Sequence, residues 1–177
     1  MRFSAGATAG STLAVAPPNA SLSVTPDSIA AMGNLYSYFC AADDTAALAL
    51  FEAGPQGDDF GMLGLKGADP YDLLGDVQAQ LTGCSMETAE SNPRFGHLLS
   101  DPHDEGQWLV TLTHEVRDAL AHATPEQLGS TAGILVAGED PPRGWEVDLL
   151  ADFLERLAAL SRQAYRQQQG LYCLMSL

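Results

Sequence analysis

The stretch from residue 145 to residue 175, WEVDLLADFLERLAALSRQAYRQQQGLYCLM, decides the fold. Its apolar residues recur at three- and four-residue steps as far as Gly170, which is the spacing of one helix face. The apolar run at residues 171–175 then predicts a strand. We expect a long amphipathic helix and a C-terminal strand, both packed into the core. The predicted buried stripe of the helix is Leu149, Leu150, Phe153, Leu154, Leu157, Leu160, Ala164 and Tyr165.

Shorter elements are expected before this pair. Residues 35–40, 60–66 and 108–112 have the apolar and aromatic content of strands. Capping residues predict helix starts at Asp43 or Asp44, at Asp69 followed by a proline, at Thr113, and at Thr124 with its Thr-x-x-Gln capping box. Residues 84–92 are expected to form a polar loop.

The chain is strongly acidic. Its 177 residues carry 23 Asp and Glu against 8 Lys and Arg, a formal charge of −15. Such a field repels nucleic acid and anionic lipid and favours a basic protein partner, although it also serves solubility alone. No stretch approaches the roughly 20 apolar residues of a membrane span. We therefore expect neither nucleic acid nor membrane as a partner.

Residues 1–31 differ from the rest. They are rich in Ala, Ser, Thr, Gly and Pro, with Arg2 and Asp27 as the charged residues, and their apolar residues are too sparse for a core element. We interpret them as a disordered or mis-started extension before one domain at residues 32–177. Cys40, Cys84 and Cys173 lack disulfide or zinc spacing, which is typical of a reduced cytoplasmic protein.

Several short motifs occur in a suggestive order. Leu81-Thr82-Gly83 ends a predicted helix and is followed by Asn92-Pro93, by residues 113–120 (THEVRDAL), by residues 125–128 (PEQL), and by Trp145 with the terminal helix and strand. In this order residues 35–177 resemble the YfbM-like family of small uncharacterised bacterial proteins. The resemblance implies a single α+β domain, a mixed sheet with helices packed on it, and no established activity. The family usually has a tryptophan and a histidine where Leu74 and Gln78 align.

Two groups of polar residues could carry chemistry. His97, Asp101, His103, Asp104 and Glu105 lie in or near one predicted loop, where they could bind a ligand, perform acid–base chemistry or form a solvated turn. His114, Asp118 and His122 could share one helix face, which is a weak pattern for a metal site. Because His114 and His122 are two turns apart, about 12 Å, they cannot share one ion directly.

No nucleophile elbow, phosphate-binding loop or dinucleotide fingerprint is present, and no cofactor is predicted. Two functions from different classes remain. The first is a non-enzymatic binding protein, of the immunity or antitoxin kind, that captures a basic partner. The second is a small metal-assisted or acid–base enzyme that uses the loop at residues 97–105.

Overall fold

The computed structural model describes residues 34–54, 63–103, 106–138 and 145–177. The predicted extension at residues 1–31 lies outside them, as do Asp104 and Glu105 of the predicted loop site. Among the described residues, no helix is both long and apolar enough to span a bilayer.

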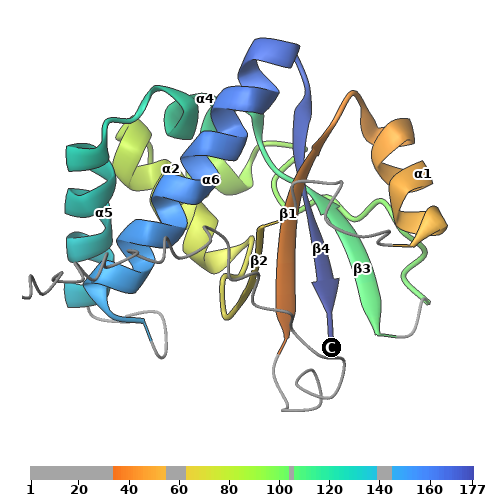
Figure 1. Cartoon of the computed structure of the whole chain (residues 1–177), viewed down its shortest axis with the longest axis horizontal. Helices are drawn as coiled ribbons and strands as arrows, with labels where there is room; N and C mark the ends of the chain where they lie inside the picture. The colour runs from red at the N-terminus through yellow and green to blue at the C-terminus, as the bar shows by residue number, and fades with distance from the viewer. Residues whose placement is uncertain (1–33, 55–62, 104–105, 139–144) are drawn as a thin grey trace, which may run out of the picture. The chain divides into compact units, whose positions relative to one another are not determined.

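Within the described residues, four strands form one sheet in the order β2-β1-β4-β3. They are β1 (Leu35–Ala41), β2 (Leu63–Lys66), β3 (Gln107–Thr111) and β4 (Gly170–Ser176). Figure 1 shows the last strand, β4, running between β1 and β3, with which it pairs along its length. The α+β class and the terminal helix–strand pair are thus confirmed. The strand pairs described are all antiparallel, where a mixed sheet was expected.

Six helices are described, and three of the four predicted starts have the expected cap. The prediction at Asp69-Pro70 is wrong, because that helix begins at Asp72, although Asp69 still accepts hydrogen bonds from the Tyr71 and Asp72 backbone N–H groups. Thr113 and Thr124 accept hydrogen bonds from backbone N–H groups three residues on, and Thr124 completes a capping box with Gln127. Asp43 caps the first helix in the same way. The helices are α1 (Asp44–Ala53), α2 (Asp72–Thr82), α3 (Met86–Glu90), α4 (His114–His122), α5 (Pro125–Ala137) and α6 (Val147–Gln167).

The short helix α3 contradicts the expected loop at residues 84–92. Ser85 caps it by accepting a hydrogen bond from the Thr88 backbone N–H. Ala89 is its one buried residue, so there is no apolar periodicity from which the sequence could predict it.

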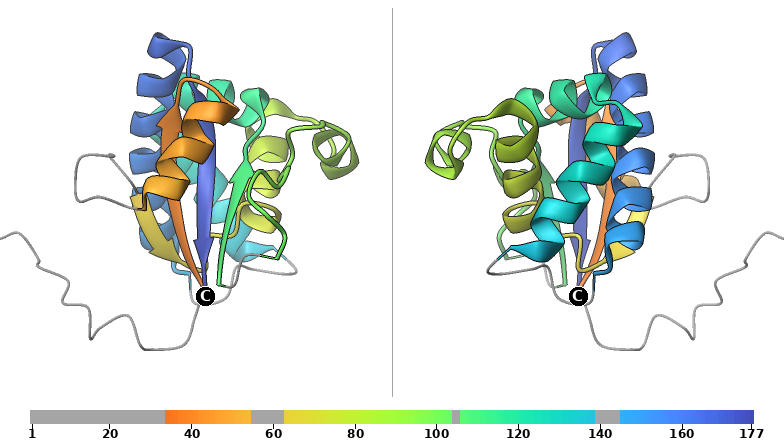
Figure 2. Two further views of the ribbon diagram at one scale, coloured as in Figure 1. Left: turned by 90° about the vertical axis from the view of Figure 1, so that its right-hand side faces the viewer. Right: turned by 90° about the vertical axis from the view of Figure 1, so that its left-hand side faces the viewer.

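Helices cover both faces of the sheet. Helix α1 packs on one face, against Phe39, Tyr172 and Leu174. The opposite face, with Tyr38 and Cys173, packs against α2, α4, α5 and α6. Figure 2 shows α1 in front of the strands in one view, and α5 in front with α2 and α6 on either side in the other. Because successive strand residues point to opposite faces, β4 must be apolar at nearly every position.

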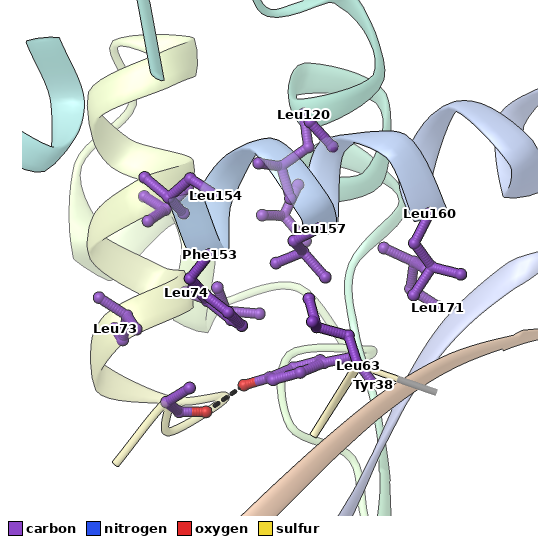
Figure 3. Packing of buried hydrophobic residues seen from close by; sticks show 14 of the residues in the cluster. Tyr38, Leu63, Leu73, Leu74, Leu120, Phe153, Leu154, Leu157, Leu160 and Leu171 are labelled. Carbon is purple, nitrogen blue, oxygen red and sulfur yellow. Dashed lines mark hydrogen bonds between the residues drawn. The ribbon is translucent and has the colours of Figure 1, made fainter. Parts of the chain in front are cut away.

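Phe153 of α6 lies at the centre of the larger core. Its ring is 5.8 Å from that of Tyr38 and 5.5 Å from that of Trp145, measured between ring centroids. The Tyr38 hydroxyl donates a hydrogen bond to the backbone carbonyl of Ala68. Figure 3 shows this bond beneath the leucines of α2 and α6, so a polar atom in the core has its partner.

The prediction that Leu149 and Tyr165 belong to the buried stripe of α6 is wrong. Leu149 and Tyr165 are 47% and 45% exposed, whereas Leu150, Phe153, Leu154, Leu157, Leu160 and Ala164 are buried. At about 100° per residue, Leu149 and Tyr165 lie on opposite flanks of the buried arc. The three- and four-residue spacing of apolar residues does not show how much of the helix surface the neighbouring elements of the fold cover.

Candidate functional site

The loop predicted as a site is described in two parts. The His97 backbone carbonyl accepts a hydrogen bond from Thr111, and its exposed imidazole is close enough to Asp44 to contribute to lowering the pKa of that carboxyl. Asp101 and His103 are also exposed, and the Asp101 carboxylate accepts from the His103 backbone N–H at 2.9 Å. This bond closes a turn. A shared ligand for His97, Asp101 and His103 therefore stays a prediction.

Asp118 and His122 of α4 contact different partners. Asp118 accepts from Arg117 Nε at 2.6 Å and pairs with its Nη2 at 2.6 Å. The His122 ring contacts the Asp118 backbone carbonyl through Nδ1 and packs edge-on against Tyr165, 4.7 Å between centroids. Among the described residues no group of three or more His, Cys, Asp or Glu side chains is placed to hold a metal ion.

A network at the end of the sheet joins residues that the sequence did not connect. Asp44, at the start of α1, accepts a hydrogen bond from the Tyr172 hydroxyl at 2.9 Å and pairs with Arg94 Nη1 at 2.9 Å. The Arg94 guanidinium also lies over the Tyr172 ring, 5.7 Å from its centroid. Burial and the bond to Asp44 raise the pKa of Tyr172 to about 12, so the phenol remains a donor at neutral pH.

Backbone contacts fix the position of Arg94. Thr111, which is buried in β3, donates from its hydroxyl to the Arg94 carbonyl at 2.7 Å. Asn92 accepts from the Arg94 N–H at 2.9 Å and donates from its amide to Glu115 of α4 at 2.9 Å. The Asn92-Pro93 motif thus places a guanidinium beside the first turn of α4.

This network borders a cleft with two adjoining hollows of about 460 and 590 Å³. They share His114 and Gln168 in their walls. Arg94, Asp44 and Tyr172 line the first hollow, and Arg117, Tyr165 and Arg166 line the second. We call the two hollows together the arginine cleft.

The cleft imposes a positive environment on His114. Burial, and then the charges of Arg117 and Arg94, lower the pKa of its imidazole, and nearby carboxylates oppose them only in part. His114 is therefore neutral at neutral pH, able to donate one ring N–H.

The sequence offered one overlooked signal for this cleft. The chain has 8 basic residues in all, and three of them line it, in segments centred on positions 94, 117 and 166. These positions lie far apart in the chain and meet only in the folded structure, so spacing along the chain could not reveal them.

A second, smaller cavity lies where the family resemblance places a tryptophan and a histidine. Leu74 and Gln78 line it, and its volume is about 10 Å³. Such a space holds one water at most. Gln78 is 4% exposed, and its amide oxygen accepts a hydrogen bond from the Thr113 hydroxyl at 2.5 Å. The Gln78 side chain is therefore already occupied by a bond within the protein.

Replacing Thr113 with alanine is expected to cost about 2 kcal/mol of unfolding free energy. The change removes the cap of α4 and leaves the buried Gln78 amide without this partner. Urea denaturation measures the loss. Thr124→Ala is the matched control, because Thr124 caps an exposed helix start and should cost about 1 kcal/mol. Equal losses in the two variants would show that the contact with Gln78 contributes nothing.

Comparisons with known proteins show little. No family model matches the chain, and no curated protein matches it. One solved structure is similar, YfbM from Escherichia coli, a protein of unknown function. The identity is 15% and the TM-score 0.38, over 80% of this chain and 99% of that one.

Proposed function

We propose that this protein is a non-enzymatic binding protein, of the immunity or antitoxin kind, that captures a basic protein in the cytoplasm. The proposal places it in the YfbM-like family on the motif order of its sequence. The binding surface is the first half of α6 together with its N-cap residue, Glu146, and we call it the α6 surface. It consists of Glu146, Val147, Asp148, Leu149, Asp152 and Glu155.

The observation that carries the proposal is a row of exposed carboxylates on α6 that is flanked by two exposed large apolar residues. Val147 and Leu149 are 40% and 47% exposed and lie in one turn of α6. Asp148, Asp152 and Glu155 follow each other at four- and three-residue steps on the exposed side of the same helix. At about 100° per residue these carboxylates lie between Val147 and Leu149 around the helix, so the surface has a charged centre flanked by two exposed apolar side chains. A charged centre of this kind suits a basic partner.

Electrostatics supports a basic partner. The 16 carboxylates and 6 basic residues of the described segments are unevenly placed, since three of the basic side chains line the arginine cleft. On the α6 surface the described ion pair is a long one, 3.9 Å between Asp152 and Arg156, both exposed. An acidic surface speeds the encounter with a cationic protein at low salt.

Charge reversal on α6 tests the proposal. A basic protein is first captured from the native host by the full chain, with the products of neighbouring genes as the first candidates. The double variant Asp152→Lys, Glu155→Lys should then lower its association rate about tenfold or more at low salt. The wild-type rate should itself fall as the Debye length shrinks from about 10 Å to about 3 Å. Stopped-flow fluorescence at several salt concentrations measures both effects.

The control carries the same change of net charge elsewhere. Glu52→Lys, Glu90→Lys reverses exposed carboxylates at the ends of α1 and α3, and should alter the rate much less. A third variant, with Asp101, Asp104 and Glu105 reversed, tests the loop predicted from sequence. If the association rate changed neither with salt concentration nor in any of the three variants, the electrostatic proposal would be wrong. The negative charge would then serve solubility alone.

A further inference from the structure

We propose that the arginine cleft binds the phosphate group of a small phosphate monoester. The inference is independent of the α6 surface, because it concerns different residues at the other end of that helix. It rests on the convergence of three guanidinium groups, on hydrogen-bond donors left without acceptors, and on the size of the cleft.

Three guanidinium groups converge on this cleft in a chain whose net charge is −15. Asp44 and Asp118 compensate two of them, Arg94 and Arg117. Arg166 takes part in none of the three ion pairs formed by the described residues, and it is exposed. Asp43 and Asp44 line the first hollow with Arg94, so the surplus of positive charge lies in the second hollow, at Arg166. Burial is the largest cause of the lowered pKa of His114, and the charges of Arg117 and Arg94 add to it.

Donors remain unused after the internal bonds are made. Arg94 donates from Nε to the Leu112 carbonyl and from Nη1 to Asp44, but its Nη2 is buried and has no hydrogen-bond partner among the described residues. Buried guanidinium nitrogens ordinarily have acceptors. This nitrogen has no exposed surface, so the donors open to an anion are those of Arg166, which is exposed and forms none of the described ion pairs.

Gln168 stands where the two hollows meet and is held in an uncommon conformation. Its φ is 56°, in the left-handed region that favours glycine. Two helical carbonyls, those of Ala164 and Tyr165, accept from the backbone there, so this residue terminates α6. The helix end thus sets a side-chain amide, a further potential N–H donor, beside His114 and Arg166.

The arrangement of donors favours phosphate over carboxylate. Arg94 precedes β3, Arg117 lies on α4 and Arg166 lies at the end of α6, so the donors reach the cleft from three separate segments. A tetrahedral phosphate presents oxygens in several directions, whereas a planar carboxylate is matched by one guanidinium edge. Hollows of about 460 and 590 Å³ leave room for the organic part of an ester.

The test titrates the full chain with inorganic phosphate by calorimetry, at pH 7.5 and constant ionic strength. Saturable binding to one site is expected, and Arg166→Gln should weaken it about tenfold, the effect of one charge-assisted hydrogen bond. Arg156→Gln removes the same charge from the same helix outside the cleft and should change the affinity less than about twofold. Circular dichroism confirms that both variants are folded.

A second readout locates the anion. The NMR titration midpoint of the His114 imidazole should move upward when phosphate is bound, because a neighbouring anion stabilises the imidazolium. The absence of saturable binding, equal effects of the two arginine variants, or an unchanged His114 midpoint would overturn the proposal. Tighter binding of acetate than of phosphate would overturn the choice of ligand. None of these outcomes bears on capture of a basic protein by the α6 surface.

Discussion

A chain that ends at Gln169, and so lacks β4, is expected to be insoluble or molten. The missing strand pairs with β1 on one side and with β3 on the other, so its loss leaves two unpaired strand edges. Residues 171–174 are each at most 6% exposed and lie on both faces of the sheet. Burying each large apolar side chain contributes about 1.5–3 kcal/mol, and a domain is stable by only about 5–15 kcal/mol in total.

Near-ultraviolet circular dichroism and dye binding measure this outcome. The shortened chain should lose its aromatic signal and bind a hydrophobic dye, the behaviour of a molten state. A chain that lacks only Leu177 is the control, because that side chain is 74% exposed and lies beyond the strand. A cooperative melting transition in the chain that ends at Gln169 would contradict the placement of β4 at the centre of the sheet.

Replacing Phe153 with alanine is expected to cost about 3–5 kcal/mol, the range for a buried aromatic residue. Phe153 is 1% exposed and contacts the rings of both Tyr38 and Trp145, so its truncation leaves a cavity in the core. Denaturation in guanidinium chloride measures the loss of unfolding free energy.

Leu149→Ala is the matched control for Phe153→Ala. Leu149 shares the apolar pattern of α6 but is 47% exposed, so its truncation should cost about 0.5 kcal/mol or less. A loss of several kcal/mol at Leu149 would return it to the core and remove the exposed apolar pair on which the proposed α6 surface depends.

The polar cluster at residues 97–105 was suggested by composition, and the arginine cleft was not. His97, Asp101 and His103 are close in sequence, which draws attention to them, but the described contacts of Asp101 and His103 form a local turn. The residues around His114 come from segments far apart in the chain. Sequence proximity identifies candidate residues, whereas a site with depth needs contributions from several elements.

Local rules in the sequence determined the starts of α1, α4 and α5, but not α3, which lies in a predicted loop, nor the start of α2 at Asp72. Side-chain oxygens at Asp43, Thr113 and Thr124 select helix starts because they satisfy backbone donors only a few residues away. The apolar run before the C-terminus likewise predicted β4, because a strand buried on both faces must be apolar at nearly every position.

Tertiary structure alone decided which flanks of α6 are buried, how the strands pair, and which charges meet. Leu149 and Leu150 are adjacent leucines, yet 47% and 0% exposed, because burial depends on whether a neighbouring element reaches that side of the helix. Arg94 and Asp44 are 50 residues apart and become partners only because the sheet brings the start of α1 beside the segment before β3. The periodicity of apolar residues indicates which face of one helix or strand can be buried. Which elements meet that face depends on the path of the whole chain.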